Sequence, residues 1–227
     1  MFPRAQVEIE VSIPAGDDYW VPKPSDIDEE GFGDFRGVWP IVQATTRLTA
    51  DVIEDERVAA AYVDAQASTP EAFEKLAYEI ECYWPAVGDS EAPDFAARLG
   101  SGWGGLENLE LGVAGLTYAL SNAGFYPAAS CRSHVGERSW SPNPVVIFAG
   151  DKRRVVLLER LAQESGCGLL ADYSRGNFLY VYAPSIQEMM TLASAIFRNR
   201  VPFRGLPKTG RKQSPPRPNA SNQPTLF

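Results

Sequence analysis

Apolar and polar residues alternate strictly near the start of the chain. Val7, Ile9, Val11 and Ile13 fall on one face, and glutamate or serine stands between them. A period of two residues is typical of a half-buried β-strand with one face in water. The sequence therefore predicts a strand over 7–13.

Helical spacing dominates the part of the chain that follows an acidic loop. Apolar residues recur at three- and four-residue intervals over 51–66 and again over 70–82. The second segment also has a typical helix start, because Thr69 can cap it and Pro70 suits its first turn. We expect two helices here.

Between 106 and 198 the apolar pattern switches repeatedly between the periods of helix and strand. The predicted elements, in order, are a helix over 106–120, strands over 126–131 and 145–148, a helix over 151–165, strands over 169–173 and 178–182, and a helix over 185–197. This α-β-β-α-β-β-α order predicts an α+β fold. We expect a mainly antiparallel four-stranded sheet with helices on one face.

The chain thus divides into three regions. An N-terminal strand and helical region with the acidic loop occupies 1–105, and the glycine-rich stretch before Leu106 ends it. The α-β-β-α-β-β-α core occupies 106–198. The last region, 199–227, is basic, proline-rich and poor in apolar residues, so we expect a disordered tail.

Charge separates the tail from the rest. The formal net charge of the 227 residues is −8, but the segment from Arg198 to the end holds seven basic residues and no acid. Residues 1–197 therefore hold 14 basic and 29 acidic side chains, a net charge of −15. Such a body repels phosphates, so any DNA would be contacted at most through the tail.

Nothing in the sequence indicates a membrane or a secreted protein. No apolar run approaches the roughly 20 residues that span a bilayer, and the first residues do not resemble a signal peptide. Three cysteines are too few, and an odd number, for a disulfide scaffold. We expect a cytoplasmic protein that does not bind membranes.

The chain ends in Gln223-Pro224-Thr225-Leu226-Phe227. An apolar pair at the end of a polar tail has no neighbours that would bury it. The five residues resemble the short peptide by which bacterial replication and repair proteins bind the DNA sliding clamp. The resemblance implies that Gln223 would contact a polar rim and that Leu226 and Phe227 would enter an apolar pocket of the clamp. Pro224 departs from the apolar residue that is commoner there.

The only histidine, His134, lies three residues after Cys131, where a strand opens into a loop. If the strands are antiparallel, Cys131 and Cys167 reach the same end of the sheet, and the three side chains become neighbours. Two cysteines, a histidine and water would suit zinc, whereas a thiolate beside a histidine base would suit nucleophilic catalysis. A hydrogen-bonded loop histidine with two buried thiols is the structural alternative. The polar partners expected in the same loop are Arg132, Glu137 and Arg138.

Lys152, Arg153 and Arg154 occupy the first turn of a predicted helix, where positive charge opposes the helix dipole. They suggest an anion-binding site, because free N–H groups point the same way. In the alternative reading, Asp151 caps the turn and the long side chains extend into water.

Together these patterns favour an accessory or regulatory protein of bacterial DNA replication, repair or mobile-element maintenance, tethered to the sliding clamp. The alternative is an enzyme, a hydrolase or a nucleic-acid-processing enzyme, with Cys131 and His134 as catalytic residues and Cys167 beside them. We assign no cofactor and no metal from the sequence.

Overall fold

A computed structural model describes residues 2–16, 18–28, 31–32, 35–36, 44–83, 93–100, 103–135, 139–173 and 177–206. Its centre is a four-stranded sheet formed by β4 (Tyr126–Cys131), β5 (Val145–Ala149), β6 (Gly168–Asp172) and β7 (Phe178–Tyr182). The strand order is β4-β5-β7-β6, and each neighbouring pair is antiparallel. The predicted α+β class and antiparallel sheet are confirmed.

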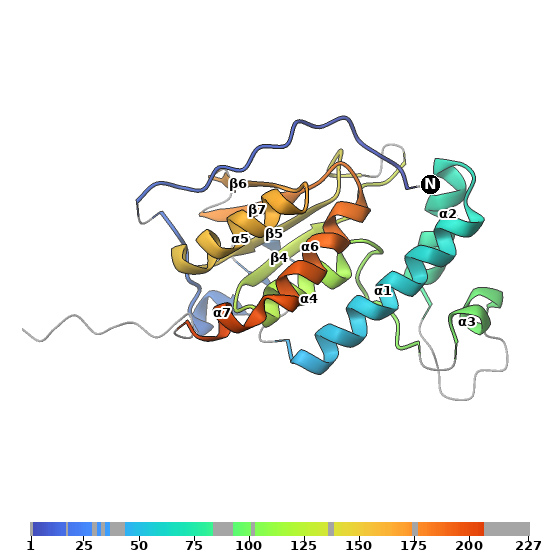
Figure 1. The fold of residues 1–227 in the computed structure, drawn as a ribbon, viewed down its shortest axis with the longest axis horizontal. Helices are drawn as coiled ribbons and strands as arrows, with labels where there is room; N and C mark the ends of the chain where they lie inside the picture. The colour runs from blue at the N-terminus through green and yellow to red at the C-terminus, as the bar shows by residue number, and fades with distance from the viewer. Residues whose placement is uncertain are drawn as a thin grey trace, which may run out of the picture.

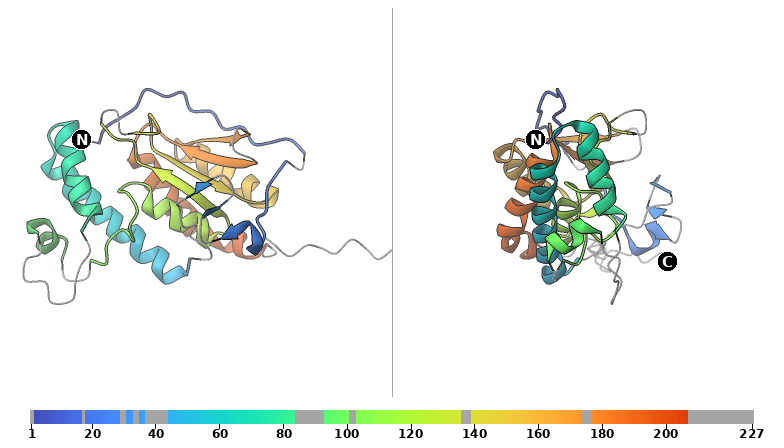
Figure 2. Two further views of the ribbon diagram at one scale, coloured as in Figure 1. Left: turned by 180° about the vertical axis from the view of Figure 1, so that it is seen from behind. Right: turned by 90° about the vertical axis from the view of Figure 1, so that its right-hand side faces the viewer.

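Helices cover one face of this sheet (Figure 1). They are α4 (Ala114–Asn122), α5 (Lys152–Glu164) and α6 (Ile186–Arg198). Side chains alternate along the strands, so that Val146, Phe148 and Val181 enter the core beneath the helices, while Val145 and Ile147 face the other way. Seen from behind, the sheet lies in front of the helices (Figure 2).

The N-terminal helices form a second core against α4. They are α1 (Thr46–Gln66), α2 (Pro70–Glu81) and the short α3 (Asp94–Leu99). Within α4, Leu116 and Leu120 pack toward the sheet, whereas Ala114 and Tyr118 pack toward α1 and α2. A helix buried on all sides in this way joins the two cores.

The remaining elements of the described chain are short. A 3-10 turn, η1 (Pro24–Asp26), precedes three two-residue strands, β1 (Ile27–Asp28), β2 (Gly31–Phe32) and β3 (Phe35–Arg36), which pair antiparallel. The last helix is α7 (Arg200–Arg204).

The predicted strand over 7–13 is wrong. The segment is extended and crosses the β6 edge of the sheet (Figure 1), but it makes only one parallel bridge, Val11 with Leu169. The backbone N–H of Leu169 donates to the carbonyl of Glu10, and the N–H of Ser12 donates to the carbonyl of Leu169. Residues 7–13 therefore cover the edge strand β6 without adding a fifth strand to the sheet.

Two helix boundaries also differ from the prediction. Residues 106–113 form turns instead of the first half of a helix, because Gly112 has a φ of +92° and Glu107 and Asn108 also have positive φ. The predicted start of the disordered tail at residue 199 is also wrong, since α7 is helical and Phe203 is buried in the core. The tail beyond Leu206 lies outside the described residues.

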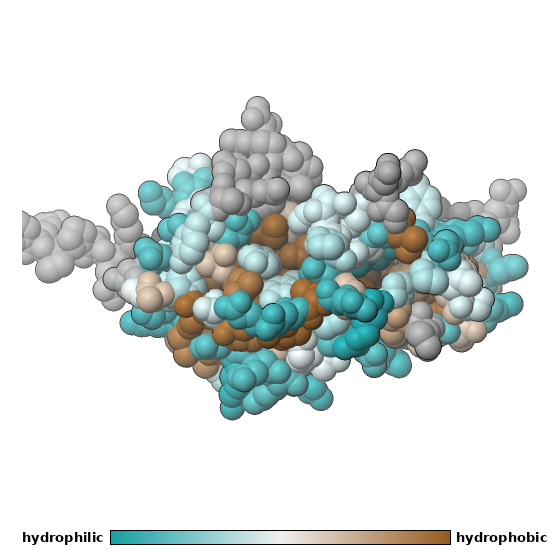
Figure 3. Space-filling model, turned by 90° about the horizontal axis from the view of Figure 1, so that it is seen from above, coloured by the Kyte–Doolittle hydropathy of each residue, from teal (hydrophilic) through white to brown (hydrophobic). Residues whose placement is uncertain are grey.

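No helix among the described residues is long and apolar enough to cross a membrane. Seen from above, hydrophilic side chains cover much of the surface and interrupt a band of hydrophobic ones (Figure 3).

Candidate functional site

Polar and charged side chains meet where β4 ends, between α2 and the turns at 106–113. Arg132 follows the last residue of β4, and its side chain is fully shielded from solvent. Its Nη1 and Nη2 donate to Glu74 at 2.6 and 3.1 Å, and its Nε and Nη2 donate to Glu81 at 2.7 and 3.3 Å. Two bidentate pairs therefore fix the guanidinium between two carboxylates of α2.

His134 lies between two carboxylates from different parts of the chain. Its Nδ1 is 2.8 Å from Glu74 Oε1, and its Nε2 is 3.1 Å from Glu110 Oε1. The other oxygen of Glu110 accepts the backbone N–H of Arg132 at 2.6 Å. Glu110 thus links the turns at 106–113 to the end of β4.

Cys131 completes the group of potential ligands. Sγ of Cys131, Nε2 or Nδ1 of His134 and a carboxylate oxygen of Glu110 lie within 4.8 Å of one another. The thiol lies 3.8 Å from Ser139 Oγ and accepts the backbone N–H of Ser133 at 3.4 Å. Among the described residues, these three side chains could hold a metal ion.

Burial and charge act against each other in the pKa values of this cluster. Burial raises the pKa of Glu81, although Arg132 opposes the shift. At Glu74 burial also acts upward, but hydrogen bonds from Arg132 and His134 prevail and the pKa is lowered. Burial raises the pKa of the Cys131 thiol, which does not favour a free nucleophilic thiolate.

A small cavity opens beside His134. Its volume is about 160 Å³, and Glu74, Arg132, Ser133 and His134 contribute to its wall. His134 is 20% exposed and Glu110 is 31% exposed, so the group is reachable from solvent. The arrangement can hold a cation or exchange a proton between an imidazole and a carboxylate.

The expectation that Cys167 neighbours Cys131 and His134 is wrong. Cys131 ends β4 and Cys167 precedes β6, and these strands form opposite edges of the sheet. Three interstrand spacings separate them, about 14 Å. The Cys167 thiol instead donates to the carbonyl of Glu188.

Glu56 is a buried carboxylate outside this cluster, and no pattern in the sequence indicates it. It lies on α1 and accepts the backbone N–H of Gly112 at 2.9 Å, and the N–H groups of Ala114 and Gly115 also bond to it. The N-terminus of α4 has no side-chain cap of its own. Glu56 therefore caps α4 from another helix.

The predicted anion-binding residues do not converge on one point. Nζ of Lys152 donates to the carbonyl of Gly16, and Nε of Arg154 donates to the carbonyl of Ala123 at 3.0 Å. Asp151 caps the helix by accepting the N–H of Arg154. Arg153 is exposed. Anion binding here stays a prediction.

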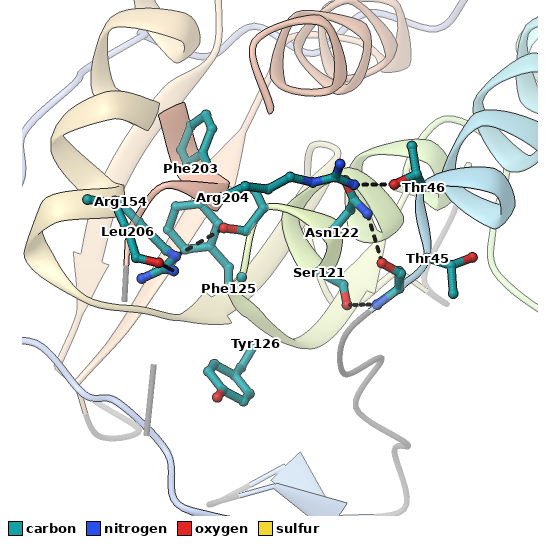
Figure 4. A pocket seen from close by; sticks show the side chains of 13 residues that line it. Thr45, Thr46, Ser121, Asn122, Phe125, Tyr126, Arg154, Phe203, Arg204 and Leu206 are labelled. Carbon is teal, nitrogen blue, oxygen red and sulfur yellow. Dashed lines mark hydrogen bonds between the residues drawn. The ribbon is translucent and has the colours of Figure 1, made fainter. Parts of the chain in front are cut away.

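Arg154 also lines a pocket with a volume of about 440 Å³. Figure 4 shows Arg204 reaching Thr46 and Asn122 across this pocket, while Arg154 contacts the carbonyl of Leu206. Both guanidinium groups thus donate to oxygens of the protein, which is typical of a structural role.

Several predicted site residues lie outside the described residues: Glu137, Arg138, Gln223, Leu226 and Phe227. Comparisons of the chain with protein-family models, curated proteins and solved structures give no match.

Proposed function

We propose that this protein is an accessory or regulatory protein of bacterial DNA replication, repair or mobile-element maintenance that binds the DNA sliding clamp. The observation that carries the proposal is the sequence Gln-Pro-Thr-Leu-Phe at 223–227. In this proposal Gln223 contacts a polar rim of the clamp, and Leu226 and Phe227 enter its apolar pocket. Since the clamp works on DNA in the cytoplasm, the protein would be cytoplasmic.

The number of residues between the described body and the peptide supports this proposal. Phe203 packs in the core, and the described chain ends at Leu206. The 16 residues between Leu206 and Gln223 span at most about 55–60 Å when fully extended. A clamp-bound peptide therefore leaves room for the body to contact a neighbouring protein.

Charge supports a protein tether rather than a broad DNA-binding surface. Of the seven basic residues from Arg198 onward, Arg198, Arg200 and Arg204 belong to α6 and α7. Nη1 of Arg200 donates to the carbonyl of Phe197. Only four basic residues are therefore left between the described body and the peptide, which is few for a broad DNA-binding surface: Lys208, Arg211, Lys212 and Arg217.

The test is binding of the full-length protein to purified bacterial clamp, with a labelled peptide of residues 208–227 measured beside it. Leu226→Ala and Phe227→Ala should each weaken binding by at least tenfold, because buried apolar anchors dominate small interfaces. Thr225→Ala is the matched control and should bind like the parent. Absence of binding at tens of micromolar, or equal binding by all variants, would refute the proposal.

An enzyme, a hydrolase or a nucleic-acid-processing enzyme, is the second candidate function. It is favoured by the cavity beside His134, and it would use Cys131 and His134 without Cys167. His134→Gln should abolish any activity on nucleotides or nucleic acids while leaving clamp binding unchanged. Equal activity of this variant would exclude the candidate.

A further inference from the structure

We propose that Glu110, Cys131 and His134 bind one zinc ion at the end of β4. The three side chains come from two segments that the turns at 106–113 bring together. They offer a carboxylate oxygen, a thiolate sulfur and an imidazole nitrogen, the three protein ligand types of zinc. This site is independent of the proposed clamp-binding peptide.

The distances fit such a site closely. Nε2 of His134 and Oε1 of Glu110 are 3.1 Å apart, and all three potential ligand atoms lie within 4.8 Å of one another. In a tetrahedral zinc site with the usual bond lengths, neighbouring ligand atoms are roughly 3.3–3.8 Å apart. A side-chain movement of about 1 Å is therefore enough to complete the geometry.

Each proposed ligand is also held by a partner of the kind that surrounds metal sites. Nδ1 of His134 faces Glu74, which orients the ring and leaves the lone pair of Nε2 toward Glu110. Glu110 is held through its second oxygen by the N–H of Arg132, and the Cys131 sulfur accepts the N–H of Ser133.

The charges around the site favour a cation. Three carboxylates meet here, those of Glu74, Glu81 and Glu110. The guanidinium of Arg132 binds the first two, whereas Glu110 accepts only the backbone N–H of Arg132. With its proton on Nδ1, His134 presents an acceptor to another acceptor, the Glu110 oxygen. In this tautomer a divalent cation would coordinate Nε2, Oε1 and Sγ together.

The ligand set selects zinc and leaves one position open. A thiolate ligand disfavours magnesium and calcium, which bind oxygen ligands. Three protein ligands leave the fourth tetrahedral position for water, as in zinc sites that keep an open position. The partial exposure of His134 and Glu110 gives that position access to solvent.

The test uses full-length protein without a polyhistidine tag, stripped of metal by a chelator. Zinc is then added in competition with a chromophoric chelator, and cobalt is substituted in a parallel sample. The parent should bind one equivalent of zinc, and its cobalt form should show tetrahedral d–d bands and a thiolate-to-cobalt charge-transfer band.

Three variants should change these results. Cys131→Ser should remove the charge-transfer band. His134→Gln and Glu110→Gln should each weaken zinc binding by more than 100-fold, beyond the 10–100-fold loss that is typical when a hydrogen-bond partner of a metal ligand is removed. Because Cys131 is buried, circular dichroism checks that variant's fold. His134→Gln and Glu110→Gln alter partly exposed side chains and provide the independent readout.

Cys167→Ser and Cys82→Ser are the matched controls, since one thiol lies at the opposite sheet edge and the other is exposed. Both should keep the zinc affinity and the cobalt spectrum of the parent. The proposal is overturned if the parent binds no zinc, if binding survives in His134→Gln and Glu110→Gln, or if the cobalt form lacks the thiolate band.

Discussion

Replacement of Glu56 by glutamine is expected to remove a pH dependence from the stability of the fold. Glu56 is only 1% exposed, and burial raises its pKa from 4.5 to about 7, although the N–H groups of Gly115, Gly112 and Ala114 lower it. The folded protein therefore retains a proton that the unfolded chain releases at lower pH.

The sign and size of the effect follow from this difference. Below pH 4.5 both states are protonated, and the stabilising contribution is fully present. It is lost as the pH rises from 4.5 to about 7. A difference of about 2.5 pH units corresponds to about 3 kcal/mol in the free energy of unfolding. Glutamine does not titrate, so the variant should lack this loss.

The assay is urea unfolding of both proteins at closely spaced pH values from 4 to 8, followed by tryptophan fluorescence. The difference in unfolding free energy between them should change by about 3 kcal/mol across the window, in favour of the variant at high pH. Glu54→Gln, an exposed change on the same helix, is the control and should show a nearly constant difference. A constant difference for Glu56→Gln, or one that changes in the opposite direction, would refute the reasoning, because the helix N–H groups would then keep the carboxylate ionised.

Three further changes test the fold. Gly112→Ala should destabilise the protein by about 1–3 kcal/mol in urea unfolding, because φ is +92° and the new Cβ would lie 2.2 Å from Ile186 Cβ. Gly16 also has a positive φ, but a Cβ added there would meet no atom within 4 Å, so Gly16→Ala should cost less. Equal costs would contradict the packing argument. Arg132→Met should cost about 3 kcal/mol, since it removes the buried guanidinium that pairs with the partly buried carboxylates of Glu74 and Glu81, and a loss below 1 kcal/mol in thermal or urea unfolding would count against the network. Asp151→Ala should cost about 1 kcal/mol through loss of the cap, and an unchanged midpoint of unfolding would show that the cap is dispensable.

Local signals in the sequence predicted the elements of the fold well. Thr69 and Asp151 cap helices as expected, and the two apolar runs around 174–176 pair as β6 and β7. These features depend on neighbours within a few residues, which a single sequence displays directly.

The candidate site depends on contacts that no local pattern displays. Glu74 and Glu81 lie seven residues apart on one face of α2, a spacing that could have drawn attention to them, but nothing near them indicates Arg132. The apolar spacing predicts a helix over 106–120 that includes Glu110, whereas positive φ at Gly112 places Glu110 in turns. Cys167 lies at the β6 edge of the sheet, opposite β4, because of the strand order. The alternation of apolar and polar residues does not determine that order.

The extended segment at the start of the chain has a consequence for how the protein folds. The Tyr182 hydroxyl donates to the carbonyl of Glu8, 174 residues away, and Ala5 donates to the carbonyl of Pro184. Contacts of such high sequence separation raise the contact order and slow folding. During synthesis, residues 5–12 are made long before β6 and β7, so they can cover the sheet edge only after both strands have been made.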